Sequence, residues 1–427
     1  MDEAAHIRLL SLKASDSLFT ADLPSASPLA QNRDRDWGKS VRLKSIRSRR
    51  SPRKTNLAPR IVRRYDSSRH AWSLRPKLLA PCRLRWYNTV IMRVKDRLLS
   101  YFERHTDEHV SGERLAALLG VSRAAVWKAI QELKSEGYVF SAVTNKGYRL
   151  EQGPDILSLS GIASYVPEDF ASLIHFHEEL ESTNKTAKLL AMDGAPHGTA
   201  VAAVRQTGGR GRRGRSFASP EGGVYLSIVL RPSVLAMSLN GALLVTSATA
   251  VAISQAISEV CGIEVSIKWV NDLYYRGKKV CGILSEGVAD LESGGLDCIV
   301  VGAGVNFSTP VEDFPEEIRS IAGSLYDNRM QIPSGVSRNR LAALMIRKIL
   351  SVCVGLEQRH FLDEYRRRSF LIGQQVMVLA GEVPLPAIVL SIDDDCHLVV
   401  QYENGMVEHI GTGDVSIRFS QAVKDLT

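Results

Sequence analysis

The chain of 427 residues is poor in cysteine and has no apolar run long enough to cross a membrane. Its six cysteines are scattered without a C-x-x-C pair, which argues against a zinc ribbon or a redox dithiol and favours reduced cysteines in the cytoplasm. The most apolar stretch, residues 241–257, contains serine, threonine and glutamine and is shorter than the roughly 20 residues of a membrane span. We therefore expect a buried helix there and no membrane partner. Internal repeats and the pattern of a secretory signal are both missing.

Positive charge is concentrated at the start of the sequence. The whole chain has 54 Lys+Arg against 46 Asp+Glu, a formal net charge of +8. Residues 1–91 carry 20 basic and 7 acidic side chains (net +13), so residues 92–427 carry a net −5. We interpret residues 1–91, which are rich in Arg, Ser and Pro and lack periodicity, as a disordered extension or as non-native upstream sequence with Met92 as the start. A basic arm that binds nucleic acid is the alternative.

Apolar periodicity begins at Val94 and predicts an α+β multidomain fold. We expect a helical module with a hairpin at 92–153, a mixed α/β catalytic domain at 160–369 and a small β-barrel at 370–427, with a linker at 153–154. In the second domain, strands are predicted at 200–204, 224–230, 264–269, 279–286 and 297–301, and helices at 181–192, 239–260 and 338–367. In the third, strands are predicted at 375–379, 386–392, 398–402, 406–410 and 415–417.

The first module has the pattern of a winged helix-turn-helix. Ser111 and Ser122 are expected N-caps of two short helices that a turn at Gly120 joins. The apolar positions expected to face the core are Leu115, Leu118, Leu119, Val126, Ile130 and Leu133. The outer face of the second helix and the tip of the following hairpin then carry the candidate DNA-binding residues Ser122, Arg123, Trp127, Lys128, Gln131 and Lys146. A three-helix module that binds protein is the alternative.

The most specific motif is residues 206–217, which interleave four glycines with four arginines directly after a predicted strand. Glycine lets backbone N–H groups approach a ligand, and arginine offers a planar charged fork for phosphate or carboxylate. The pattern predicts a loop that closes over an anionic ligand. A flexible segment that binds RNA is the alternative, and it is weakened because this loop lies within a folded domain.

Two further segments add polar groups at strand ends. Residues 268–272 and 278–284 are separated by a turn at 275–277, so a hairpin is expected to bring Asn271, Asp272 and Lys279 together. Residues 302–306 form a glycine-rich segment, expected at the end of a strand, that finishes in an asparagine. Each segment alone is explained about as well by turn formation.

Together these motifs resemble the bifunctional biotin–protein ligase and biotin operon repressor family over residues 92–427. The glycine/arginine loop is followed by a KWPND-like motif at 268–272, a KxxGIL motif at 279–284 and a GxGxN motif at 302–306. The resemblance implies a winged helix-turn-helix, a ligase domain related to class II aminoacyl-tRNA synthetases and a C-terminal SH3-like barrel. Val270 departs from the usual Pro of the second motif, and Phe217 stands where Trp is common.

The resemblance also implies site residues. Biotin would contact Ser182, Thr183, Asn184, Gln206, Arg210, Gly211, Arg212 and Lys279. ATP and the adenylate would contact Arg212, Arg215, Asn271 and Asn306. The catalytic set would be Arg212, Lys279 and Asp272. We expect no metal site made by a protein cluster, with Asp272 serving either the Mg²⁺ of MgATP or the incoming lysine.

The implied reaction joins biotin to AMP and then to a lysine of the biotin carboxyl carrier protein of acetyl-CoA carboxylase. The implied cofactors are ATP and Mg²⁺, and the implied partners are biotin operator DNA and a second copy of the chain when the adenylate is bound. The alternatives are a lipoate-type protein ligase and a non-catalytic repressor that senses a ligand.

Two other clusters are expected to be inert. His175 and His177 alternate as in a strand, and with no nearby cysteine or carboxylate cluster a metal site is disfavoured. Residues 393–395, three consecutive aspartates, are expected to form a solvated turn without Ca²⁺.

Overall fold

The computed structural model describes residues 93–105, 108–143, 146–152, 155–289, 295–379, 384–411 and 414–416. The expectations for residues 1–91, for the 153–154 linker, for Asn145 at the hairpin tip and for Ile417 lie outside these ranges. Five cysteines lie inside them, and all five are free thiols, as expected.

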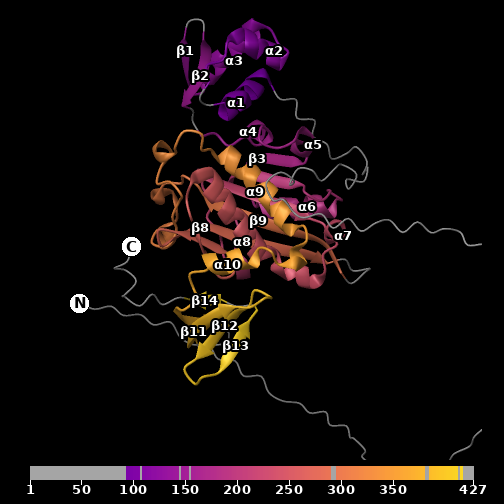
Figure 1. Ribbon diagram of the computed structural model, residues 1–427, viewed down its shortest axis with the longest axis vertical. Coiled ribbons are helices and arrows are strands. Elements are labelled where there is room, and N and C mark those ends of the chain that lie inside the picture. The colour runs from indigo at the N-terminus through magenta and orange to yellow at the C-terminus, as the bar shows by residue number, and fades with distance from the viewer. Residues whose placement is uncertain are drawn as a thin grey trace, which may run out of the picture. The chain divides into compact units, whose positions relative to one another are not determined.

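The first domain is a three-helix module with a two-stranded hairpin (Figure 1). Both predicted caps form: Ser111 Oγ accepts from the Arg114 backbone N–H at 3.1 Å, and Ser122 Oγ from that of Ala125 at 3.2 Å. Gly120 adopts φ +65°, a left-handed conformation that favours glycine and ends the second helix. The elements are α1 (Val94–Arg104), α2 (Gly112–Leu119), α3 (Arg123–Ser135), β1 (Val139–Val143) and β2 (Gly147–Gln152).

Burial in this domain corrects one predicted core position. Leu115 and Leu119, one helical turn apart, are buried, but Leu118 is 52% exposed. A helix of eight residues presents only a narrow stripe to its neighbours, so the third leucine lies on the flank, facing solvent. The other predicted core residues, Val126, Ile130 and Leu133, are buried as expected.

The second domain is built on a seven-stranded mixed sheet with the order β3-β4-β5-β9-β8-β7-β6. Only β3 and β4 are parallel, and the remaining neighbours are antiparallel. The strands are β3 (Ile174–Leu180), β4 (Ala200–Gln206), β5 (Gly223–Leu230), β6 (Ser266–Lys268), β7 (Asp272–Tyr275), β8 (Lys278–Ala289) and β9 (Leu296–Asn306). The α-helices are α4 (Leu159–Ala163), α5 (Glu168–Ala171), α6 (Thr183–Met192), α7 (Pro232–Leu235), α8 (Leu239–Cys261), α9 (Arg338–Cys353) and α10 (Leu362–Arg368).

Strand alternation divides this sheet into two faces. Leu226 and Ile228 of β5 belong to the main core with α8 and α9, whereas Val229 packs with Ala187 and Ala191 of α6. Helix α6 therefore covers the opposite face from α8 and α9, because successive side chains of a strand point to opposite sides. Figure 1 shows α8 and α9 lying across the sheet.

Helix α8 is the apolar segment singled out from the sequence. It is the one helix in the described ranges with the length and composition of a membrane span, and 72% of its most apolar window is buried inside the protein. The prediction of a buried helix is confirmed.

Two predicted boundaries are wrong. The helix expected at 338–367 is broken into α9, a 3₁₀ turn (Leu356–Gln358) and α10, because Gly355 takes φ +70°. Strand β9 continues to Asn306, beyond the predicted end at 301, so the segment 302–306 forms the last five residues of the strand. Helix α6 and the glycine/arginine loop cover the glycines of this segment.

The C-terminal domain is a five-stranded antiparallel sheet with the order β13-β12-β11-β10-β14. It hydrogen-bonds to the second domain through the β11–β12 turn, where the Trp269 indole N–H donates to the Cys396 carbonyl at 2.8 Å. The strands are β10 (Gln375–Leu379), β11 (Leu385–Ile392), β12 (Leu398–Tyr402), β13 (Val407–Ile410) and β14 (Asp414–Ser416).

One buried ion pair anchors the start of the second domain. Arg338 Nε lies 2.6 Å from Asp155 Oδ2, and the two side chains are 3% and 6% exposed. The same carboxylate accepts the Arg338 backbone N–H at 2.8 Å, at the first residue of α9.

We expect Asp155→Ala to cost about 3–5 kcal/mol, because it leaves the buried guanidinium without its counter-charge, with only backbone carbonyl acceptors. The measurement is the calorimetric unfolding of the second domain in the full-length chain at neutral pH. Glu221→Ala removes the exposed pair with Arg329 in the same domain and should cost less than about 1 kcal/mol. Equal losses in the two variants would contradict the assignment.

Candidate functional site: a cavity over a glycine floor

A cavity of about 280 Å³ opens on the α6 face of the sheet. Its neutral polar lining comes from Ser182, Thr183, Asn184, Gln206, Ser216 and Asn271. Its charged lining comes from Arg210, Arg212, Arg215, Lys268, Asp272 and Lys279. The remaining lining residues are Gly211, Phe217, Trp269, Gly282, Ile283, Leu284, Gly302, Ala303, Gly304 and Leu379. The cavity thus unites all three motifs that the sequence singled out.

Paired glycines form the floor of the cavity. In the β8–β9 register Gly282 lies opposite Gly304, and Leu284 opposite Gly302. A Cβ at Gly302 would lie 1.9 Å from Asn184 Oδ1, and a Cβ at Gly304 would lie 2.4 Å from the Phe217 ring. The absence of side chains therefore lets α6 and the glycine/arginine loop approach the sheet directly.

One wall is a network of neutral hydrogen-bonding groups. Gln206 Oε1 accepts from the Thr183 backbone N–H at 2.8 Å and from the Thr183 hydroxyl at 3.1 Å. Gln206 Nε2 donates to Ser219 Oγ at 2.8 Å. Ser227 Oγ, fully buried in β5, lies 2.8 Å from Thr183 Oγ1 and donates to Asn184 Oδ1 at 2.6 Å. These bonds fix the donors and acceptors that face the cavity.

The N-cap of α6 leaves a hydroxyl available to a ligand. Ser182 occupies the N-cap position, yet its side chain makes no capping hydrogen bond. The residue is only 2% exposed and lines the cavity. An ordinary cap would use this oxygen for a backbone N–H, so the structure favours a ligand-binding role over a purely local one.

A carboxylate outside the cavity lining orients Asn184. Glu286 Oε2 accepts from Asn184 Nδ2 at 2.8 Å, and Glu286 Oε1 lies 2.8 Å from Lys188 Nζ. Burial alone would raise the pKa of Glu286, but these hydrogen bonds hold the pKa below its ordinary value. Glu286 is therefore ionised at neutral pH and fixes the direction of the Asn184 amide.

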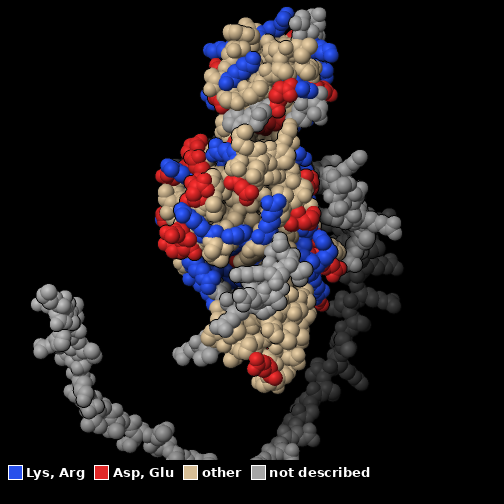
Figure 2. Space-filling model, turned by 90° about the vertical axis from the view of Figure 1, so that its left-hand side faces the viewer, with Lys and Arg blue, Asp and Glu red and all other residues tan. Residues whose placement is uncertain are grey.

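The opposite wall carries a surplus of positive charge. Five basic side chains and one acidic side chain line the cavity. Lys279 Nζ lies 2.7 Å from Asp272 Oδ1, and Arg212 donates to Asn271 Oδ1 at 3.5 Å. In Figure 2, side chains of both signs are mixed on the face drawn, so the cationic lining is a local feature. The cavity suits a ligand with an anionic centre beside a neutral polar group.

The structure brings most predicted site residues together, with one exception. Asn306 does not line the cavity: it is 4% exposed, and its amide donates to the Gly323 carbonyl at 2.9 Å. Sequence reasoning missed Ser219, Ser227 and Glu286. Ser227 could have been noticed as a polar residue within an apolar strand. The site contacts of Ser219 and Glu286 are with residues that are distant in the sequence, so no local pattern indicates them.

The candidate DNA-binding residues lie on a separate surface. Ser122, Arg123, Lys128 and Gln131 are exposed along α3, and Trp127 is 57% exposed. Lys146 is exposed beside the start of β2. An exposed Trp among basic and amide side chains is not core, which leaves this face of α3 available to a partner.

Three family models match the chain in the order of its domains. Residues 96–149 match an HTH domain, residues 177–306 the biotin/lipoate A/B protein ligase family, and residues 371–418 the biotin protein ligase C-terminal domain. A biotin protein ligase from Aquifex aeolicus, solved with biotin and ATP, is 28% identical. It aligns over 58% of this chain and 99% of its own, with a TM-score of 0.47.

Two relatives carry the name of a bifunctional ligase/repressor. The bifunctional ligase/repressor BirA of Bacillus subtilis is 43% identical over 230 residues, which cover 53% of this chain and 69% of the relative. The protein of that name from Escherichia coli is 28% identical over 319 residues, 74% of this chain and 94% of the relative. With the HTH, ligase and C-terminal domains in sequence, the chain belongs to the family of bifunctional biotin ligase/repressors.

Proposed function

We propose that the chain activates biotin with ATP, transfers it to a carrier-protein lysine, and represses transcription through its HTH domain. One observation carries this proposal: a single cavity combines a neutral hydrogen-bonding wall with a cationic wall. The intermediate biotinoyl-5′-AMP needs both, because its ureido head is neutral and its phosphate is charged.

The neutral wall suits the biotin head. Thr183 and Gln206 offer hydroxyl and amide groups held by the network described above, and Ser182 offers an uncommitted hydroxyl. Such groups can satisfy a urea inside an otherwise apolar pocket. Arg210 and Gly211 would cover this end, and the Asn184 amide would complete it.

The cationic wall suits the first chemical step. The biotin carboxylate attacks the α-phosphorus of ATP, and pyrophosphate leaves. The carboxylate is itself the nucleophile, so alignment and charge neutralisation are the main requirements. Arg212 and Arg215 would bind the α-phosphate, and Lys279 the carboxylate. Burial raises the pKa of the Cys281 thiol, which disfavours the thiolate that a covalent cysteine intermediate would need.

The second step transfers biotin to a protein. The ε-amine of a lysine on the biotin carboxyl carrier protein of acetyl-CoA carboxylase attacks the acyl carbon, AMP leaves and the amine loses a proton. Asp272, the only carboxylate among the described residues that line the cavity, would orient this amine. Asn271 and Asn306 are proposed to serve ATP, Asn306 indirectly through the turn at Gly323.

The residues that line the cavity fit Mg²⁺ only when the ion is also bound by the phosphates of ATP. A single carboxylate already paired with Lys279 cannot form a protein cage, whereas one or two carboxylates plus phosphates are a usual Mg²⁺ environment. Contact with the ion in the first step is thus the alternative role of Asp272 to orienting the lysine, and the ion would neutralise phosphate charge when bound.

The repressor function completes the proposal. The adenylate would order the loop at 209–215 and favour a homodimer, whose two winged helices would bind a palindromic operator. We further propose that the ligase domain has the class II synthetase-like architecture, that the C-terminal sheet is an SH3-like barrel, and that the protein acts in the cytoplasm. The lipoate ligase and the non-catalytic sensor are not favoured, since the domains and the charged groups of a biotin ligase are all present.

The central test is ATP–pyrophosphate exchange that depends on biotin. Lys279→Gln should lower it about 100-fold, since one charged contact to the reacting carboxylate is lost. Lys278→Gln is the matched control, because Lys278 does not line the cavity and its ammonium donates to the Arg319 and Ser320 carbonyls. Exchange driven by lipoate alone would favour the lipoate ligase, and no exchange by the wild type would favour the sensor.

A second test addresses the glycine floor. Gly302→Ala should weaken biotin binding by at least about tenfold, because the new methyl group displaces Asn184. Gly287→Ala on β8 is the control, since its Cβ would meet only the end of the Leu296 side chain, at 3.0 Å. Calorimetric titration with biotin measures both variants, and unchanged affinity in Gly302→Ala would remove Asn184 from the site.

A third test addresses DNA binding. Arg123→Ala should weaken binding to duplexes carrying the biotin synthesis promoter and reduce the salt dependence of log K by about 1. Lys134→Ala, on the C-terminal end of α3, should leave both quantities unchanged. If the two variants behave alike in a titration at several salt concentrations, α3 does not enter the groove as proposed.

A further inference from the structure

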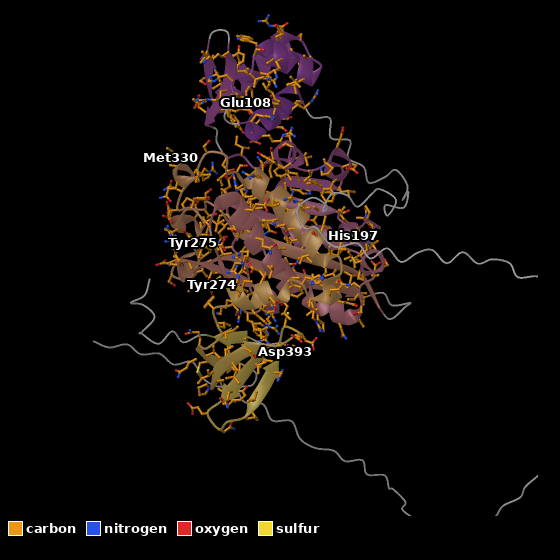
Figure 3. The ribbon with its side chains drawn as sticks, in the orientation of Figure 1. Glu108, His197, Tyr274, Tyr275, Met330 and Asp393 are labelled. Carbon is orange, nitrogen blue, oxygen red and sulfur yellow. The ribbon has the colours of Figure 1, made fainter. Side chains whose placement is uncertain are left out.

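Three potential metal ligands converge in the C-terminal domain, far along the sequence from the ligase motifs. Asp393 follows β11, His397 precedes β12 and His409 lies in β13 (Figure 3 labels Asp393). One ligand atom from each lies within 4.8 Å of the other two. Asp393 Oδ2 is 2.7 Å from His409 Nδ1 and 3.2 Å from His397 Nδ1. The expectation of a merely solvated turn is therefore incomplete, because Asp393 is tied to two imidazoles.

The turn holds the carboxylate in one orientation. Asp393 Oδ1 accepts the backbone N–H groups of Asp395 at 3.0 Å and His397 at 2.8 Å. Its other oxygen therefore faces the two imidazoles. The turn itself is closed by the Asp393 backbone N–H, which donates to the His397 carbonyl at 3.0 Å. These bonds reduce the cost of organising the cluster around a ligand.

Room for the His397 ring depends on a glycine. A Cβ at Gly411 would lie 2.8 Å from His397 Cδ2 and Nε2. Gly411 follows β13 directly, so the strand that carries His409 also provides the space for the second imidazole. The two histidines are thus placed by neighbouring strands and not by a flexible tail.

The donor chemistry selects the type of ion. Two imidazole nitrogens and one carboxylate oxygen suit Zn²⁺, which binds His at about 2.0–2.1 Å and carboxylate at about 2.0–2.2 Å. Ligand atoms around a tetrahedral ion with these bond lengths lie about 3.3 Å apart. The two observed separations, 2.7 and 3.2 Å, lie slightly below that value, so small side-chain movements would admit the ion. Mg²⁺ and Ca²⁺ prefer an all-oxygen set.

We propose that Asp393, His397 and His409 form a Zn²⁺ site, with solvent completing the coordination. The ion links β13 to the β11–β12 turn. That same turn holds Cys396, whose carbonyl accepts from the indole of Trp269 in the cavity wall, and Asp394, which lies 2.7 Å from Arg366. Zn²⁺ therefore stabilises the segment through which the C-terminal domain contacts the ligase domain. This inference is independent of the proposed ligase chemistry.

The test is a calorimetric titration of the full-length chain with ZnCl₂ in the absence of nucleotide. The wild type should bind one more equivalent than His409→Gln, or bind it at least about tenfold more tightly. Co²⁺ should give the visible absorption of a tetrahedral site in the wild type and lose it in the variant. Zn²⁺ should also raise the melting temperature of the wild type more than that of His409→Gln.

Two further variants separate this site from others. His177→Gln removes one of the paired histidines of β3 and should leave the Zn²⁺ equivalent intact. Gly411→Ala keeps all three ligands but should weaken Zn²⁺ binding by crowding His397. Equal Zn²⁺ binding by wild type and His409→Gln, or loss of the ion in His177→Gln alone, would overturn the proposal. Circular dichroism of the exposed-site variant His409→Gln checks that its fold is retained.

Discussion

The pairing of β8 with β9 is the constraint on which the active cavity depends. Its register sets Gly282 against Gly304 and Leu284 against Gly302, so that three glycines and one leucine face α6 where the ligand would lie. A slip of one residue would turn these glycines to the α8 face and present larger residues to Asn184 and Phe217. The register is held by the alternation of buried residues on the other face, which packs against α8 and α9. Core packing on one side thus creates the cavity on the other.

Local signals in the sequence predicted local features well. Ser111 and Ser122 cap helices as expected, and the turn before Lys278 forms the expected hairpin, because such features depend on a few neighbouring residues. The glycine/arginine loop and the 268–272 segment meet in one cavity, which the order of motifs and the family resemblance anticipated. Their individual roles in binding remain proposals.

Features that depend on distant contacts were not predictable in this way. Glu286 orients Asn184 across a separation of 102 residues, and Ser227 bonds the same amide from another strand. Asn306 belongs to a motif of the family, yet its amide binds a turn. Leu118 has the expected spacing but lies on the flank of a helix too short to bury it.

The hydrogen bond from Trp269 to Cys396 has a consequence for how the chain can be divided. The indole sits in the wall of the cavity, and its only polar group is satisfied by a carbonyl from the C-terminal domain. Separating that domain would remove this acceptor and would expose the cavity wall to water. The C-terminal domain is therefore an integral part of the enzyme and not an accessory module.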